Sequence, residues 1–168
     1  MKVYFAGPLF TVYERDYISK CAVQLRQKGW DVFVPHENTS PPAPDDKRSI
    51  AKRCLDKDFS EIASSNAILA LINGTEVDDG TAAEIGIFHA LMKTDATKKG
   101  IVALHDDWRT KFGGEGKPLN LFVAGCLQQS GKICFNLEDA MQQLQTWQCQ
   151  LEKDALSVKT DSTVGLSL

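Results

Sequence analysis

The stretch Ala67-Ile68-Leu69-Ala70-Leu71-Ile72, which is followed by Asn73-Gly74 and then by Asp78-Asp79-Gly80-Thr81-Ala82-Ala83-Glu84, decides the fold. The short apolar run predicts a buried strand, and apolar residues at helical spacing from Ile85 to Met92 predict the helix after it. A strand that leads directly into a helix is half of a parallel α/β unit. Open sheets of this kind bind ligands at the carboxyl ends of their strands, so the acidic loop between the two elements is a candidate site.

The rest of the chain alternates strands and helices in the same way. The expected strands are residues 2–6, 31–35, 67–72, 100–105 and 132–135, and the expected helices are residues 13–28, 49–64, 81–92, 120–129 and 137–156. This alternation predicts an α/β protein, a single-domain, doubly wound, five-stranded parallel sheet. In the flavodoxin-like strand order 2-1-3-4-5, the first and third strands are neighbours at the switch point.

The chain ends and the long loops complete this outline. Residues 1–156 are expected to form the domain, and residues 157–168, which lack periodicity, a polar C-terminal tail. Residues 36–46 and 106–117 are long loops, a length that is typical of lids and binding loops.

Composition argues against several kinds of partner. The chain has 168 residues and a net charge of −3 without a basic block, which argues against nucleic acid. No apolar run is long enough for a membrane span, and the first strand begins at once, so neither a membrane nor a signal peptide is expected. Five scattered cysteines without a CxxC pair indicate a cytoplasmic protein without a metal site. Gly7-Pro8 carries no dinucleotide or triphosphate fingerprint, so no cofactor is expected.

The acidic loop also has a purely structural interpretation. Thr81-Ala82-Ala83-Glu84 matches a capping box, in which the Thr81 side chain accepts from the Glu84 amide and Glu84 reaches back to the Thr81 amide. Asp78 and Asp79 would then favour the positive end of the helix dipole without any chemistry. The loop alone is compatible with both interpretations.

Four separated motifs give the chain a resemblance to one family. They are Val3-Tyr4-Phe5-Ala6-Gly7-Pro8-Leu9-Phe10, Lys57-Asp58, Asp78-x-Gly80-x-x-x-Glu84 and Lys117-Pro118-Leu119-Asn120-Leu121. Their order and positions resemble the nucleoside 2-deoxyribosyltransferases over about residues 1–136. The resemblance implies an enzyme of nucleoside salvage that transfers the 2-deoxyribosyl group between nucleobases. It also implies 2′-deoxynucleosides and free nucleobases as ligands, and chemistry without metal or organic cofactor.

The resemblance also assigns roles to single residues. Glu84 matches the nucleophile of a retaining double displacement through a covalent deoxyribosyl ester, in the manner of retaining glycosidases. Asp58 matches the carboxylate at the nucleobase and is the candidate general acid. Tyr4 matches the tyrosine that orients the nucleophile, and Asp78 matches a carboxylate that helps to hold the sugar.

The remaining matched residues are expected to bind substrate. Gly7, Leu9 and Phe10 form the first loop, in which Leu9 and Phe10 would be an apolar wall for the base. Asn120 and Phe122 match residues that relatives lend to a neighbouring subunit. The resemblance therefore implies a homo-oligomer, from dimer to hexamer, in which these two residues complete the neighbouring site.

Two other functions stay open. A hydrolase of the same fold, a 2′-deoxynucleoside 5′-monophosphate N-glycosidase, would use water as the acceptor. Such relatives typically carry Ser and Arg in the first loop, whereas Arg15 is the cation closest to this loop and is expected on the following helix. A non-catalytic flavodoxin-like binding module would need the acidic loop only as a helix cap.

Overall fold

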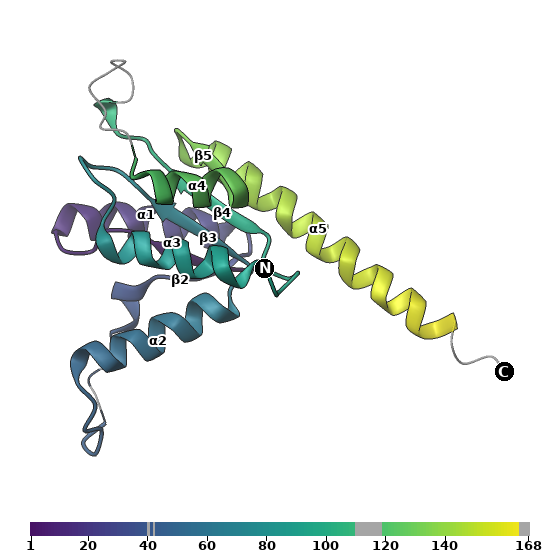
Figure 1. Cartoon of the computed structure of the whole chain (residues 1–168), viewed down its shortest axis with the longest axis horizontal. Coiled ribbons are helices and arrows are strands. Elements are labelled where there is room, and N and C mark those ends of the chain that lie inside the picture. The colour runs from purple at the N-terminus through teal and green to yellow at the C-terminus, as the bar shows by residue number, and fades with distance from the viewer. Residues whose placement is uncertain (40, 42, 110–118, 165–168) are drawn as a thin grey trace.

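Apolar strands pair in parallel to form the centre of the molecule (Figure 1). The computed structural model describes residues 1–39, 41, 43–109 and 119–164. The strands are β1 (Lys2–Ala6), β2 (Asp31–Phe33), β3 (Ala67–Leu71), β4 (Gly100–Leu104) and β5 (Gly131–Cys134). The helices are α1 (Val12–Gln27), the 3-10 helix η1 (Pro35–Asn38), α2 (Ile50–Ser64), α3 (Asp79–Leu91), α4 (Leu121–Ser130) and α5 (Leu137–Val164). Within the described residues the sheet has the order β2-β1-β3-β4-β5, which confirms the predicted fold.

Helices cover both faces of the sheet, which explains why its strands are almost wholly apolar. On one face, α1 and α5 pack against alternate strand residues such as Val3 and Phe5. On the other face, α2, α3 and α4 pack against the residues between them, such as Tyr4 and Ala6. The alternation of side chains along β1 therefore directs Tyr4 towards α3, the helix that carries Glu84.

Helix α5 is longer than the sequence pattern predicts. Its first turns pack on the sheet through Ala140, Leu144 and Trp147, and any Cβ at Gly100 of β4 would overlap the Trp147 ring. The expected end of the helix was residue 156, yet α5 continues to Val164 and projects beyond the sheet (Figure 1). No glycine or proline occurs within α5, and each added residue of a formed helix gains a hydrogen bond. The polar sequence from residue 157 therefore extends the helix.

Three further observations bear on the sequence expectations. Residues 110–118, which contain Lys117 and Pro118 of the fourth motif, lie outside the described residues. All five cysteines are free thiols, and Cys54 and Cys149 are exposed. Among the helices of the described residues, none combines the length and the apolar composition that crossing a membrane requires.

Candidate active site

The amino end of α3 is capped by Asp78, and this differs from the capping box that the sequence suggested. The Asp78 carboxylate accepts hydrogen bonds from the Thr81 amide at 3.0 Å and from the Thr81 hydroxyl at 3.1 Å. Thr81, the expected cap, is instead buried in the first turn. Aspartate is among the strongest N-cap residues, and Asp78 stands three residues before the amide that needs a partner. The capping box is therefore wrong, and the Glu84 side chain is not part of the cap.

Glu84 instead meets Tyr4 across the interface between α3 and the sheet. The Tyr4 hydroxyl donates a hydrogen bond to Oε1 of Glu84 at 2.5 Å. The Tyr4 side chain is fully buried on β1, whereas Glu84 is only partly exposed. The carboxylate that follows the third strand is thus held by a residue from the neighbouring first strand, at the switch point of the sheet.

Burial and neighbouring carboxylates make Glu84 an unusual acid. Burial raises the pKa of Glu84 to about 7, and the charges of Asp58 and Asp78 add to this rise, while the hydrogen bond from Tyr4 opposes it. Burial also raises the pKa of Asp58, with the charge of Glu61 adding to the rise and that of Lys57 opposing it. The pKa of Tyr4 is raised by burial and by the Glu84 charge, so its hydroxyl remains a donor.

The chemical capacity of this cluster follows from these shifts. A carboxyl group with a pKa of about 7 is ionised in about half of the molecules at neutral pH, so Glu84 can act as a nucleophile or a base there. Asp58, whose pKa is raised, retains its proton to higher pH than an exposed aspartate and can act as an acid. An acid and a nucleophile in one place are the requirement of glycosyl transfer.

The titration of Glu84 should respond in opposite directions to two substitutions. Tyr4→Phe removes the hydrogen bond that lowers the Glu84 pKa, so the pKa should rise above 7. Asp78→Asn removes a negative charge, so the pKa should fall, and asparagine keeps the helix cap. Carboxyl ¹³C NMR titration of the free protein, assigned with Glu84→Gln, measures both shifts. Equal Glu84 pKa values in all three proteins would contradict the described contacts.

The first loop follows β1 and packs on α1. Gly7 is buried, and a Cβ there would lie 2.9 Å from Cδ1 of Ile18, so only glycine fits without displacing that side chain. Leu9 packs against the apolar cluster on the α1 side, and its carbonyl accepts from Arg15 at 2.8 Å. Phe10 is 81% exposed. The expected substrate contacts of Gly7, Leu9 and Phe10 remain predictions.

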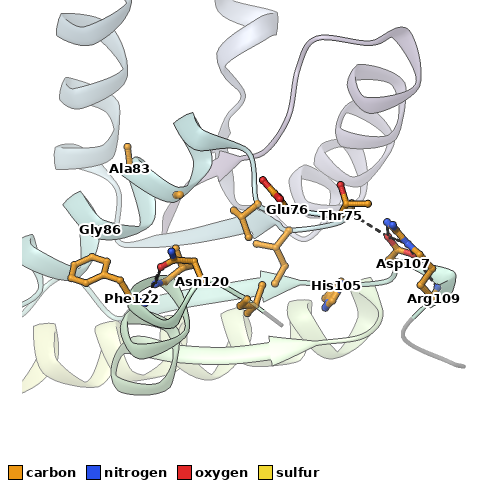
Figure 2. Close-up of a pocket in the computed structure, with 15 residues that line it drawn as sticks. Thr75, Glu76, Ala83, Gly86, His105, Asp107, Arg109, Asn120 and Phe122 are labelled. Atoms are coloured by element: carbon orange, nitrogen blue, oxygen red, sulfur yellow. Dashed lines mark hydrogen bonds and ion pairs between the residues drawn. The ribbon is translucent and has the colours of Figure 1, made fainter. Parts of the chain in front are cut away.

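Asn120 and Phe122 line a cavity of about 720 Å³, which is shown in Figure 2. Asn120 caps α4, because its Oδ1 accepts from the Phe122 amide at 2.9 Å and from the Val123 amide. Phe122 is 74% exposed. The described residues that line the cavity are Ile72, Gly74, Thr75, Glu76, Val77, Ala82, Ala83, Gly86, His105, Asp107, Arg109, Leu119, Asn120, Phe122 and Val123.

This lining separates the predicted site residues into two groups. Tyr4, Asp58 and Glu84 are not among the described residues that line the cavity. Helix α3 nevertheless contributes residues to the cavity as well as to the Tyr4–Glu84 contact. Within one chain, the structure therefore brings Glu84 and Tyr4 together, while Asn120 and Phe122 line the cavity of Figure 2.

Sequence reasoning overlooked Phe33. Its ring stacks on Tyr4 with ring centroids 5.5 Å apart, and Nζ of Lys57 lies 5.9 Å from the centre of the Phe33 ring. The available signal was the predicted strand order, since an aromatic residue on the strand next to Tyr4 can pack against it. In the described part of the chain, no three His, Cys, Asp or Glu side chains are grouped so that they could hold a metal ion.

The chain is similar in sequence or in fold to several known proteins. An uncharacterized protein of Ureaplasma parvum serovar 3 is 30% identical over 153 residues, which are 86% of this chain and 94% of the relative. A 2-deoxyribosyltransferase from Bacillus psychrosaccharolyticus has a TM-score of 0.64 and 23% identity, over 83% of this chain and 90% of that one. A CMP N-glycosidase from Clostridium botulinum has a TM-score of 0.53 and 20% identity, over 86% of this chain and 99% of that one. The two solved structures share the fold.

The family model gives the broader assignment. The model named Nucleoside 2-deoxyribosyltransferase matches residues 3–122, a range that contains both the Tyr4–Glu84 contact and Asn120. The match covers more than half of the chain, and the strand order agrees with it. The chain belongs to the nucleoside 2-deoxyribosyltransferase family.

Proposed function

We propose that the protein transfers the 2-deoxyribosyl group from a 2′-deoxynucleoside to a free nucleobase, with Glu84 as the nucleophile. The observation that carries the proposal is the hydrogen bond from the buried Tyr4 hydroxyl to Glu84. This contact holds one carboxylate oxygen, and among the described residues the other accepts no hydrogen bond, so it can face a ligand. A carboxylate suits this reaction, because it stabilises positive charge at the anomeric carbon and can form and leave an ester.

The first half of the reaction breaks the bond to the donor base. The Glu84 carboxylate attacks C1′ from the face opposite the base, and the C1′–N electron pair moves to the base nitrogen. Asp58 gives its proton to the departing base, a role that its raised pKa favours. Tyr4 keeps its hydrogen bond to Glu84 and thereby holds the attacking carboxylate in place.

The second half reverses these steps with another base. A nitrogen of the acceptor base attacks C1′ on the original face, the ester bond breaks, and Glu84 leaves as a carboxylate. The acceptor base returns its proton to Asp58. Two inversions give net retention, so the product keeps the β configuration.

The neighbouring subunit has a proposed part in this site. Asn120 and Phe122 lie at a cavity that is separate from Glu84 in the same chain, and Phe122 is largely exposed. The Asn120 oxygen is used in the cap of α4, while its amide nitrogen is not part of that cap and can donate to the 5′-hydroxyl of a nucleoside. We therefore propose a homo-oligomer in which these residues complete the site of the adjacent subunit.

The alternative is hydrolysis of a nucleotide, because a CMP N-glycosidase shares the fold. A nucleotide hydrolase needs cations for the 5′-phosphate. Arg15, which follows the first loop in sequence, donates instead to the carbonyl of Leu9. This contact favours an uncharged nucleoside over a nucleotide as the substrate.

A single assay distinguishes these activities. With 2′-deoxyinosine and adenine, the purified protein should form 2′-deoxyadenosine, while inosine and adenine should give little adenosine. The 2′-hydroxyl of a ribonucleoside withdraws electrons and disfavours the oxocarbenium-like transition state. Faster release of free base from CMP or 2′-deoxycytidine 5′-monophosphate than any transfer would support the hydrolase. No turnover of any of these substrates would support a binding module.

A further inference from the structure

The Tyr4 ring rests against a second aromatic ring. Tyr4 of β1 and Phe33 of β2 are register partners, so their side chains emerge on the same face of the sheet. Their ring centroids are 5.5 Å apart and their planes differ by 23°. Phe33 is only 8% exposed, so its ring offers little free surface on which a nucleobase could stack. Its contact with Tyr4 is therefore internal to the protein.

The Tyr4 hydroxyl is the atom of this side chain that lies farthest from the backbone. A small tilt of the ring moves the hydroxyl more than any other atom, and hydrogen bonds weaken steeply as their angle departs from linearity. The 2.5 Å contact with Glu84 therefore depends on what prevents the ring from tilting. On the β2 side, the described residue stacked on the Tyr4 ring is Phe33.

Strand β2 needs support to hold Phe33 in place. It has three residues and lies at the edge of the sheet, where β1 is its neighbour. Lys57 of α2 donates a hydrogen bond to the carbonyl of Asn38 and places its ammonium group 5.9 Å from the centre of the Phe33 ring. Arg26 of α1 donates to the carbonyl of Val32 at 2.8 Å. Side chains from two helices thus hold the strand and the segment after it.

We propose that Phe33 is a positioning residue for the reaction: its ring keeps the Tyr4 hydroxyl on Glu84, and Lys57 holds Phe33 in place. The inference rests on the proposed function, in which Glu84 is the nucleophile. Phe33 touches no reacting atom and acts through Tyr4. This separates its role from that of an apolar wall of the base pocket.

The charged groups around the pair define which variant is informative. Glu61 and Asp58 of α2 act on Tyr4, and Asp58 together with Asp78 acts on Glu84. Lys57 acts on Asp58, so a change at Lys57 alters the electrostatics directly. Phe33 carries no charge, so Phe33→Leu leaves every ionisable group in place, and repeating it in a Tyr4→Phe background separates an effect through Tyr4 from one through Lys57.

The test is a double-mutant cycle of Phe33→Leu and Tyr4→Phe, read by ¹³C NMR titration of the Glu84 carboxyl group. Phe33→Leu should raise the Glu84 pKa, because it weakens the hydrogen bond that lowers it. In the Tyr4→Phe background the same change should cause no further shift. In the transfer assay, Phe33→Leu should lower kcat about tenfold with KM nearly unchanged, and Phe33→Tyr, which keeps the ring, should restore kcat.

Phe5→Leu is the matched control, since Phe5 is a buried aromatic residue next to Tyr4 on the opposite face of the sheet. Phe5→Leu should remove about as much buried packing as Phe33→Leu does, and it should leave the Glu84 pKa unchanged. If Phe33→Leu does not fold, Phe33→Met takes its place, since its longer, unbranched side chain adapts better to the space left by the ring. A Glu84 pKa that is unchanged in Phe33→Leu, or that shifts equally with and without the Tyr4 hydroxyl, would overturn the proposal. A shifted pKa in a protein that has no transfer activity would instead refute the proposed function alone.

Discussion

Replacing Glu84 by glutamine should lower the rate of deoxyribosyl transfer by about 10⁴-fold or more while the fold is kept. The amide can still accept the hydrogen bond from Tyr4 but cannot form the ester. Since Asp78 caps α3, the change does not remove a helix cap. Asp79→Asn, a change to an exposed acid at the start of the same helix, should leave activity in place and is the matched control.

The same substitution should make the protein more stable at alkaline pH. The pKa of Glu84 is about 7 in the folded protein and about 4.5 without the fold, so the protonated form favours folding. The contribution of protonated Glu84 to the free energy of unfolding is complete below about pH 4.5 and is lost as the pH rises through 7. Above pH 7 the buried carboxylate destabilises the wild type, and Glu84→Gln should gain up to about 3 kcal/mol of unfolding free energy at pH 8.

Two measurements check these expectations. Urea unfolding at pH 4.5 and pH 8 should show the gain only at the higher pH. Intact-mass spectrometry of wild type given a 2′-deoxynucleoside without acceptor base should show one added deoxyribosyl group, which peptide mapping should place on Glu84. Glu84→Gln should show none. An adduct on Asp58 or Asp78 would move the nucleophile to that residue.

Two inactive variants should regain activity when they share an oligomer. Asn120→Asp keeps an oxygen for the cap of α4 but removes the amide donor, and should lower activity about hundredfold. If Asn120 serves the adjacent subunit, a hybrid dimer with Glu84→Gln contains one site with neither change. Random dimers of equal amounts should then reach about one quarter of wild-type activity.

Co-expression with two different tags isolates the hybrid for this assay. A hybrid no more active than the mean of its two parents would contradict the shared site, as would a fully active monomer at assay concentration measured by light scattering. The matched control is Asp79→Asn paired with wild type, which should show additive behaviour.

The fold could be predicted because each apolar run has the length of a buried strand and each periodic segment follows one. Local pattern failed where two acceptors compete for one helix end. Thr81 and Asp78 can both cap α3, and the choice depends on the buried position of Thr81, which only packing determines. Likewise, no local signal marks the end of α5, because the residues after 156 are polar but compatible with a helix.

The pairing of Tyr4 with Glu84 is expected from the family resemblance alone, because nothing in the local sequence of either residue indicates it. Tyr4 and Glu84 are 80 residues apart in sequence, and their hydrogen bond follows from strand order and side-chain direction rather than from spacing. Phe33 shows the same dependence, since it becomes relevant only when β2 lies beside β1. Asn120 reads as a helix cap in one chain, and its proposed second role needs another subunit.

The central place of β1 has a consequence for when the enzyme becomes competent. The strand lies between β2 and β3, so its amides can exchange with solvent only when the sheet itself opens. The contact between Tyr4 and Glu84 closes a long loop, and the entropy that this closure costs is offset only when the intervening strands have docked. A nascent or partly unfolded chain would therefore lack the assembled Tyr4–Glu84 pair, and the ester formation proposed for Glu84 would be confined to the folded molecule.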